Sequence, residues 1–271
     1  MSGARGAVAI RCGRVRVGGA WAYYAEAGAG PPVVVAAGLG LSTRFYEPLM
    51  LACARAGLRL LVPDLPGFGR TPGPLTGCSV AGTAGWLLRF ADAVGLDGPG
   101  WLGHSVGCQV VSAIAAEQPG RAAALALSGP TGAPGRHRPL RQLGLLARAA
   151  AGEPGSLLLA VARSYLRMSP TAYVGSWLRA GRDQPAARLA RVRCPVLVLV
   201  GERDPMPESA FVALLRDRLP SVTVAHLRGG GHGLPREAAE AFTRVAAPFF
   251  RAHVAGPARG ADPRQPEGDV A

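Results

Sequence analysis

The 271-residue chain is long enough for one large domain or two small ones, and its 49% apolar content can fill a sizeable core. Its net charge of +13 comes from 30 basic residues, all arginine, but these are spread along the chain with few aromatics between them, so we expect no nucleic-acid partner. The sequence has no apolar run of about 18–20 residues, no signal-peptide pattern after Met1 and no C-x-x-C pair among its five cysteines. We therefore expect a cytoplasmic protein with reduced thiols and with no membrane association or metal site.

The apolar pattern alternates between strands and helices over the first 128 residues. Expected strands cover 8–17, 20–26, 33–37, 58–62, 101–102 and 122–128, and expected helices cover 43–56, 79–94 and 106–117. From the third strand onward, this order predicts a mainly parallel sheet covered by helices.

The stretch 131–190 interrupts this order, because it contains no strand-like run. Helical patterns there cover 140–150, 157–168 and 172–182; afterwards strands are expected at 194–200 and 222–227, and helices at 209–219 and 236–253. The sequence therefore predicts an α/β core made of 8–130 and 191–254, with a helical insert over 131–190. The ends, 1–7 and 255–271, have little to bury and are expected to be disordered.

Residues Gly103-His104-Ser105-Val106-Gly107 form a G-x-S-x-G pattern between an expected strand and an expected helix. A serine hydroxyl is a weak nucleophile, which needs a sharp turn to expose it and a base beside it. Glycine suits such a turn because it has no Cβ to clash. The pattern indicates a nucleophile elbow with Ser105 at its tip; the alternative is a plain turn in which Ser105 is only a helix N-cap.

A base for Ser105 must come from one of five histidines. His232 lies in a glycine-rich loop, 229–233, directly after the last expected strand, where parallel sheets place their sites. His104 lies within the elbow and is expected to point away from the serine. The others lie in the insert, in a strand and near the tail: His137, His226 and His253. His232 is therefore the predicted base.

The base needs a carboxylate that fixes its tautomer and stabilises the imidazolium. Asp204 follows the apolar strand 194–200, and Pro205 restricts its backbone. Glu202 is the rival two residues earlier. We favour Asp204 as the orienting acid.

Together these features resemble the α/β-hydrolase fold family over about 8–254. The chain order Ser105, Asp204, His232 matches that family, and so do the loop 64–69, a D-x-x-G-x-G pattern, and the segment 194–204. The resemblance implies a mostly parallel eight-stranded sheet, with 131–190 as a cap over the active site. It also implies an oxyanion hole formed by the backbone N–H groups of Leu39 and Val106, although Ala37-Gly38 stands where the family often has His-Gly.

The expected function is a serine hydrolase, a carboxylic ester hydrolase that acts on an ester, thioester or similar small acyl substrate without a cofactor or metal. The same triad could instead serve acyl transfer, C–C cleavage, perhydrolysis or a cyclisation step. A third alternative is a non-catalytic binder of small molecules on the same scaffold. Candidate pocket walls are Phe45, Phe68, Tyr173 and Trp177, although Tyr and Trp at helical spacing are more often part of a cap core than substrate contacts. The sequence does not indicate the oligomeric state.

Overall fold

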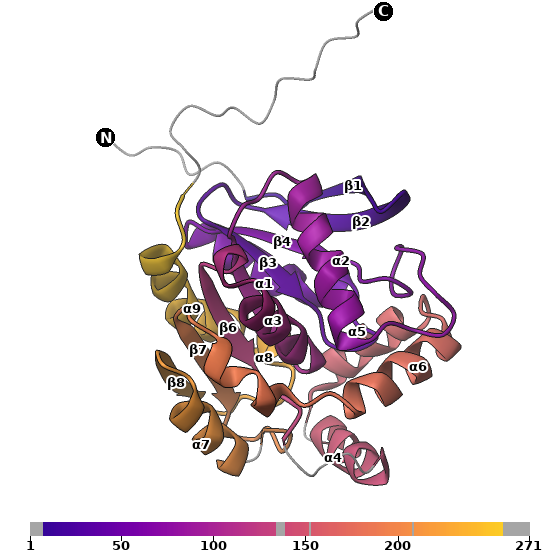
Figure 1. Cartoon of the computed structure of the whole chain (residues 1–271). Coiled ribbons are helices and arrows are strands. Elements are labelled where there is room, and N and C mark those ends of the chain that lie inside the picture. The colour runs from indigo at the N-terminus through magenta and orange to yellow at the C-terminus, as the bar shows by residue number, and fades with distance from the viewer. Residues whose placement is uncertain (1–7, 134–138, 152, 208, 257–271) are drawn as a thin grey trace, which may run out of the picture.

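A sheet of eight strands runs through the centre of the molecule (Figure 1) in the order β1-β2-β4-β3-β5-β6-β7-β8. The computed structural model describes residues 8–133, 139–151, 153–207 and 209–256. The strands are β1 (Arg11–Val17), β2 (Ala20–Ala27), β3 (Pro32–Ala36), β4 (Arg59–Pro63), β5 (Gly100–His104), β6 (Ala124–Ser128), β7 (Val196–Gly201) and β8 (Val222–Leu227). β1 pairs antiparallel with β2, and β2 pairs antiparallel with β4; all other neighbours are parallel.

Helices cover the sheet in two layers (Figure 1), with α1 packed on α9 and α2 packed on α3. The helices are α1 (Glu47–Arg55), α2 (Val80–Ala93), α3 (Val106–Glu117), α4 (Pro139–Ala151), α5 (Gly155–Tyr165), α6 (Pro170–Gly181), α7 (Ser209–Arg218), α8 (Leu234–Glu237) and α9 (Ala239–His253). Four short 3-10 helices join them: η1 (Thr43–Tyr46), η2 (Pro119–Arg121), η3 (Pro185–Ala187) and η4 (Leu189–Arg191). Because both faces are covered, β5, β6 and β7 are buried along their whole length.

The predicted fold class is confirmed: the sheet is mostly parallel, helices flank it, and a helical insert of α4, α5 and α6 follows β6. Two expected helices are each divided in the structure. The 43–56 segment forms η1 and then α1, which starts at Glu47-Pro48, and the 236–253 segment divides at Ala238. Proline fits the first turn of a new helix because no N–H is needed there. His137 and the end segments 1–7 and 257–271 lie outside the described residues.

The strand before the elbow, β5, begins at Gly100, directly after the sequence Asp97-Gly98-Pro99. A Cβ on Gly100 would lie 2.8 Å from the Phe250 ring, which is fully buried on α9. Glycine at this position therefore lets α9 pack directly on the strand that carries the elbow.

The insert lies beside the carboxyl ends of the parallel strands, and its α5 and α6 run next to each other (Figure 1). None of the helices in the described ranges is both long and apolar enough to cross a membrane. The site is therefore formed where the insert meets the strand ends of the core.

We predict that Gly107→Ala destabilises the fold by about 1–3 kcal/mol, because it overpacks a dense core. A Cβ there would lie 2.0 Å from the Ala36 carbonyl oxygen, so α3 and β3 would have to separate. Urea denaturation measures the loss. Gly120→Ala is the matched control, since a Cβ there meets nothing within 4 Å, and it should be neutral or slightly stabilising. Equal stability of Gly107→Ala and the unmodified chain would contradict the prediction.

Candidate active site

The turn between β5 and α3 holds Ser105 in a strained backbone conformation. Its φ of 55° and ψ of −120° make it the one non-glycine residue with positive φ in the described part of the chain. A Cβ on Gly103 would lie 2.6 Å from the Cα of Cys108, so only glycine permits this approach. The Ser105 side chain makes no capping hydrogen bond, so the N-cap alternative does not describe this turn. The geometry is that of a nucleophile elbow.

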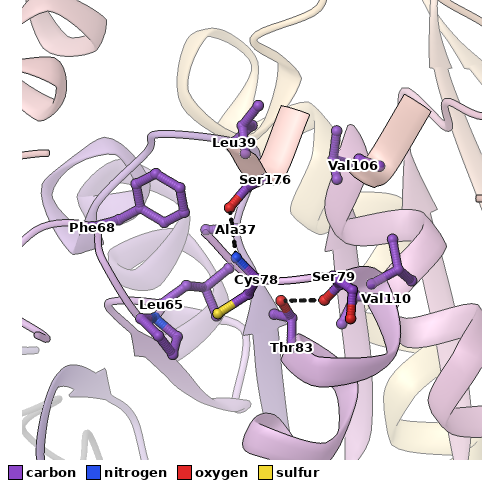
Figure 2. A pocket seen from close by; sticks show the side chains of 13 residues that line it. Ala37, Leu39, Leu65, Phe68, Cys78, Ser79, Thr83, Val106, Val110 and Ser176 are labelled. Atoms are coloured by element: carbon purple, nitrogen blue, oxygen red, sulfur yellow. Dashed lines mark hydrogen bonds between the residues drawn. The ribbon is translucent and has the colours of Figure 1, made fainter. Parts of the chain in front are cut away.

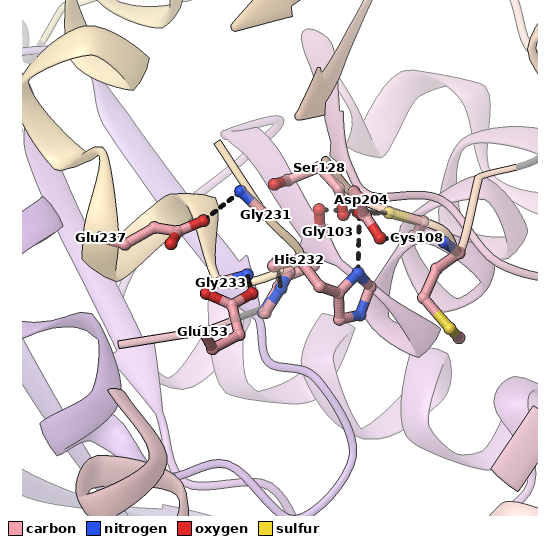
Figure 3. A network of polar contacts seen from close by, with 11 residues as sticks. Gly103, Cys108, Ser128, Glu153, Asp204, Gly231, His232, Gly233 and Glu237 are labelled. Atoms are coloured by element: carbon pink, nitrogen blue, oxygen red, sulfur yellow. Dashed lines mark hydrogen bonds and ion pairs between the residues drawn. The ribbon is translucent and has the colours of Figure 1, made fainter. Parts of the chain in front are cut away.

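His232 and Asp204 meet beside this turn (Figure 3). Nδ1 of His232 lies 2.8 Å from Oδ2 of Asp204, and the carboxylate side chain is fully buried while the imidazole is 14% exposed. The other carboxylate oxygen accepts a hydrogen bond from the Met206 N–H at 2.9 Å. Asp204 is therefore held on both oxygens, and it is positioned to keep the imidazole proton on Nδ1.

Two neighbours of this pair have defined roles. Glu202 accepts a hydrogen bond from the Gly229 N–H at 3.2 Å, and it is Asp204 that the structure brings to His232. Gly129, at the end of β6, has a φ of 55°; a Cβ there would lie 2.9 Å from Oδ2 of Asp204 and 3.0 Å from Nδ1 of His232. Gly129 thus makes room for the acid–imidazole pair, a role that the sequence did not reveal.

Ser105 and His232 both line one cavity of about 490 Å³ between the core and the insert. Leu39 and Val106 line the same cavity, and the described hydrogen bonds leave the backbone N–H groups of both residues without an acceptor. Within the described residues, no hydrogen bond joins Ser105 Oγ to His232. Such contacts are often long in the absence of substrate and shorten when substrate binds.

His104 borders the same cavity, and both its ring nitrogens belong to a buried hydrogen-bond chain. The Gly38 N–H donates to the Tyr46 hydroxyl at 2.9 Å, that hydroxyl lies 3.0 Å from Nδ1 of His104, and Nε2 of His104 lies 2.9 Å from the His232 carbonyl oxygen. An amide can only donate and a carbonyl can only accept, so the two ends of the chain assign the proton of His104 to Nε2. The chain thus joins the loop after β3, the elbow and the His232 loop.

The His104 imidazole is neutral in the folded protein. Burial, because charging a buried imidazole costs hydration, and then the nearby His232 together lower its pKa to about 3. The ring also stacks on Phe45 at 5.7 Å between centroids. Because its pKa is so low, His104 does not compete with His232 for the proton of Ser105.

The predicted pocket aromatics lie in two different cavities. Phe45, Tyr173 and Trp177 line the large cavity, together with Tyr165, whose ring packs against Tyr173 at 5.5 Å. Phe68 instead lines a small cavity of about 30 Å³, about the volume of one water molecule, which shares Leu39 and Val106 with the large one (Figure 2).

Further cavity residues were not anticipated from the sequence. Gln109, one turn after Ser105 on α3, lines the cavity beside Thr131, and its amide nitrogen donates to the Asp183 carboxylate of the insert at 3.1 Å. The spacing of four residues from the nucleophile is the signal that could have identified it. Glu153 of the insert also reaches the cavity. In the described ranges, no three His, Cys, Asp or Glu side chains are arranged to hold a metal ion.

Three known proteins illustrate the similarity of this chain to others. It is 29% identical over 261 residues to polyketide synthase ThaQ of Burkholderia thailandensis, which covers 86% of the chain but only 12% of that synthase. It is 26% identical over 259 residues to “Putative carbamate hydrolase RutD” of Variovorax paradoxus, covering 84% of the chain and 94% of that protein. The solved structure of an esterase from Thermogutta terrifontis superposes with a TM-score of 0.75 at 19% identity, covering 90% of this chain and 100% of the esterase.

A family model matches the half of the chain that carries the elbow. The model described as the alpha/beta hydrolase fold matches residues 31–166, half of the chain, from β3 through the elbow and into the insert. The sheet order, the elbow and the helical insert described above agree with that match. The chain belongs to the alpha/beta hydrolase fold family.

Proposed function

We propose that the chain is a serine hydrolase that cleaves an ester, a thioester or a similar acyl compound with an apolar acyl group. The observation that carries the proposal is the 2.8 Å contact between His232 and the buried Asp204 beside a strained Ser105, with Ser105 and His232 at one cavity edge. Nucleophilic acyl chemistry requires a buried acid, an imidazole and a serine whose hydroxyl is exposed at a sharp turn.

In the first half of the proposed reaction, Ser105 Oγ attacks the acyl carbon while Nε2 of His232 takes the serine proton. The negative oxygen of the tetrahedral intermediate accepts hydrogen bonds from the free N–H groups of Leu39 and Val106. One such donor is worth about 2.7–4 kcal/mol in a serine protease. His232 then gives its proton to the leaving alcohol or thiol, and an acyl-Ser105 enzyme is left.

The second half repeats these steps with water. His232 takes a proton from water, the hydroxide oxygen bonds to the acyl carbon, and Ser105 leaves with the proton returned by His232. Asp204 stays ionised and stabilises the imidazolium in both halves. The products are the carboxylic acid and the alcohol or thiol, and no group outside the chain and its substrate is required.

The cavity favours an apolar and uncharged acyl group. Its described lining is mainly aliphatic and aromatic, with Leu157, Leu158 and Val161 from α5 facing Leu41 and Phe45 from the core. Glu153 is the one carboxylate in that lining, so an anionic acyl group would meet a like charge and no cation there. The match to part of a polyketide synthase supports the inclusion of thioesters among the compounds to test.

We predict that a fluorophosphonate labels Ser105 and that Ser105→Ala abolishes both labelling and ester hydrolysis. Among the serines, Ser105 combines the strained turn with a neighbouring imidazole, so its oxygen is the one activated for attack. Mass spectrometry of the labelled peptide identifies the site. Ser156→Ala, an exposed serine on α5, is the matched control and should be labelled like the unmodified chain. A label on another serine would refute the proposal.

We predict that Asp204→Asn lowers kcat for ester hydrolysis by about 10⁴-fold, as the corresponding change does in serine proteases, because an amide no longer favours the Nδ1–H tautomer. Steady-state kinetics with a p-nitrophenyl ester and circular dichroism separate this effect from unfolding. Glu202→Gln is the control: it retains an acceptor for the Gly229 N–H and should keep most of the activity. A severe loss in Glu202→Gln with a mild loss in Asp204→Asn would reverse the assignment of the acid.

We predict that Trp177→Ala raises KM for a hexanoyl ester by about tenfold, because removing an indole from the cavity wall loses about 1.4 kcal/mol of apolar contact. The acetyl ester should change much less, since it does not reach the insert. A series of p-nitrophenyl esters from acetyl to decanoyl measures this preference. Trp21→Ala, on β2, which pairs with the edge strand β1, is the control. An unchanged chain-length profile would show that Trp177 belongs to the insert core.

A further inference from the structure

The loop that carries His232 has glycine on both sides of the histidine, so it has almost no side chains of its own to hold it in place. Its backbone is held by side chains from elsewhere (Figure 3). The Gly231 N–H donates to Glu237, the Gly233 N–H donates to Oε1 of Glu153 at 3.1 Å, and the His232 carbonyl lies against His104. The position of the imidazole therefore depends on two carboxyl groups that bracket it.

These carboxyl groups come from different parts of the molecule. Glu237 ends α8 in the core, whereas Glu153 lies between α4 and α5 in the insert. The glycines permit the approach of the insert: a Cβ on Gly231 would lie 2.5 Å from Oε1 of Glu153, and a Cβ on Gly233 would lie 2.5 Å from the Leu157 side chain. The insert thus contacts the loop of the base directly.

The two carboxyl groups lie close to each other, because both reach Gly231. Oε2 of Glu153 is buried, and no hydrogen-bond partner in the described part of the chain reaches it. Burial, followed by a hydrogen bond with Glu153, raises the pKa of Glu237 to about 7. A single proton held between them would satisfy the buried oxygen and leave an acceptor for each glycine amide.

Other charged groups surround this pair. Arg203 opposes the rise in the pKa of Glu237, but burial and Glu153 outweigh it. Arg236, next to Glu237 on α8, is turned to the carbonyl oxygens of Arg44 and Phe45. Arg228 lines a surface depression together with Arg203 and both glutamates. The other charged or titratable neighbours in the described part of the chain are Glu202 and His232.

We propose that Glu153 and Glu237 are positioning residues that share one proton and hold the amides on both sides of His232, so that the insert itself helps to place the base. This inference rests on the proposed role of His232. Because the pair titrates above the usual range of a glutamate, its contribution is present at acidic pH and is lost as pH rises through about 7. Above that pH the two like charges repel, and the loop loses its anchors.

The first test compares the unmodified enzyme with Glu153 variants in the pH dependence of kcat. The substrate is an acetyl ester, which is too short to reach the insert. The unmodified enzyme should lose activity as pH rises above about 7. Glu153→Ala should lower kcat by about 10–100-fold with little change in KM, because a misplaced base slows the chemical step. Glu153→Gln should rescue kcat and abolish the alkaline loss, because an amide accepts from Gly233 and donates to Glu237 without a proton to lose. Glu117→Gln, exposed at the end of α3, is the charge-matched control.

The second test does not depend on activity. Hydrogen–deuterium exchange of the peptide around 229–234 should show protection in the unmodified chain and in Glu153→Gln, and loss of protection in Glu153→Ala. If the fluorophosphonate does not label Ser105 but the exchange pattern is as expected, the proposed function is refuted and the positioning role of Glu153 and Glu237 is retained. Three results would refute the positioning role of the two glutamates: no protection of the loop in the unmodified chain, a fall in kcat above pH of about 7 that persists in Glu153→Gln, or normal kcat in Glu153→Ala.

Discussion

The strained backbone of Ser105 is the constraint on which the site depends. A backbone φ of 55° costs a non-glycine L-residue about 1–3 kcal/mol. The surrounding packing must therefore hold Ser105 in this conformation. That packing comes from two glycines: Gly103 lies against the start of α3, and Gly107 lies against the end of β3. The same close approach sets the distance between the elbow and the loop that carries Leu39. One turn therefore fixes both the nucleophile and the proposed oxyanion donors relative to each other.

A second constraint is the demand that buried polar groups be paired. The chain Gly38–Tyr46–His104–His232 crosses three loops, and every donor in it has an acceptor. Tyr46 is fully buried, and burial raises the pKa of its phenol, so the hydroxyl keeps the proton that the chain requires. In a low-dielectric interior, such a fully paired chain is strong and directional. It holds parts of the site that are up to 194 positions apart in sequence.

The sequence predicted the parts of this protein that depend on local chemistry. The strand and helix order follows from apolar periodicity, and the elbow follows from the glycines around Ser105; the predicted fold class is confirmed. The choice of Asp204 over Glu202, both of which follow the same buried strand, came from Pro205, which restricts the backbone of Asp204, and the structure puts Asp204 against His232. The catalytic roles of these residues stay predictions.

What the sequence did not reveal depends on contacts between distant residues. Gly129 has no recognisable motif, yet it frees the space in which Asp204 and His232 meet. Phe68 and Phe45 looked alike as pocket candidates, but they line different cavities. The loop 64–69, which carries Phe68, is held by Asp64, whose two carboxylate oxygens accept hydrogen bonds from backbone amides. Periodicity carries no information on such pairings.

The contact between Glu153 and the Gly233 amide bears on how far this insert can vary independently of the core. A cap that only covered a cavity would be an exchangeable module, and substrate range could change by replacing it whole. Here the segment that forms the cavity wall also holds the backbone of the histidine loop. A transplanted cap would have to bring an acceptor of its own to that amide, so selection for new substrates in this chain is confined to cap sequences that preserve it.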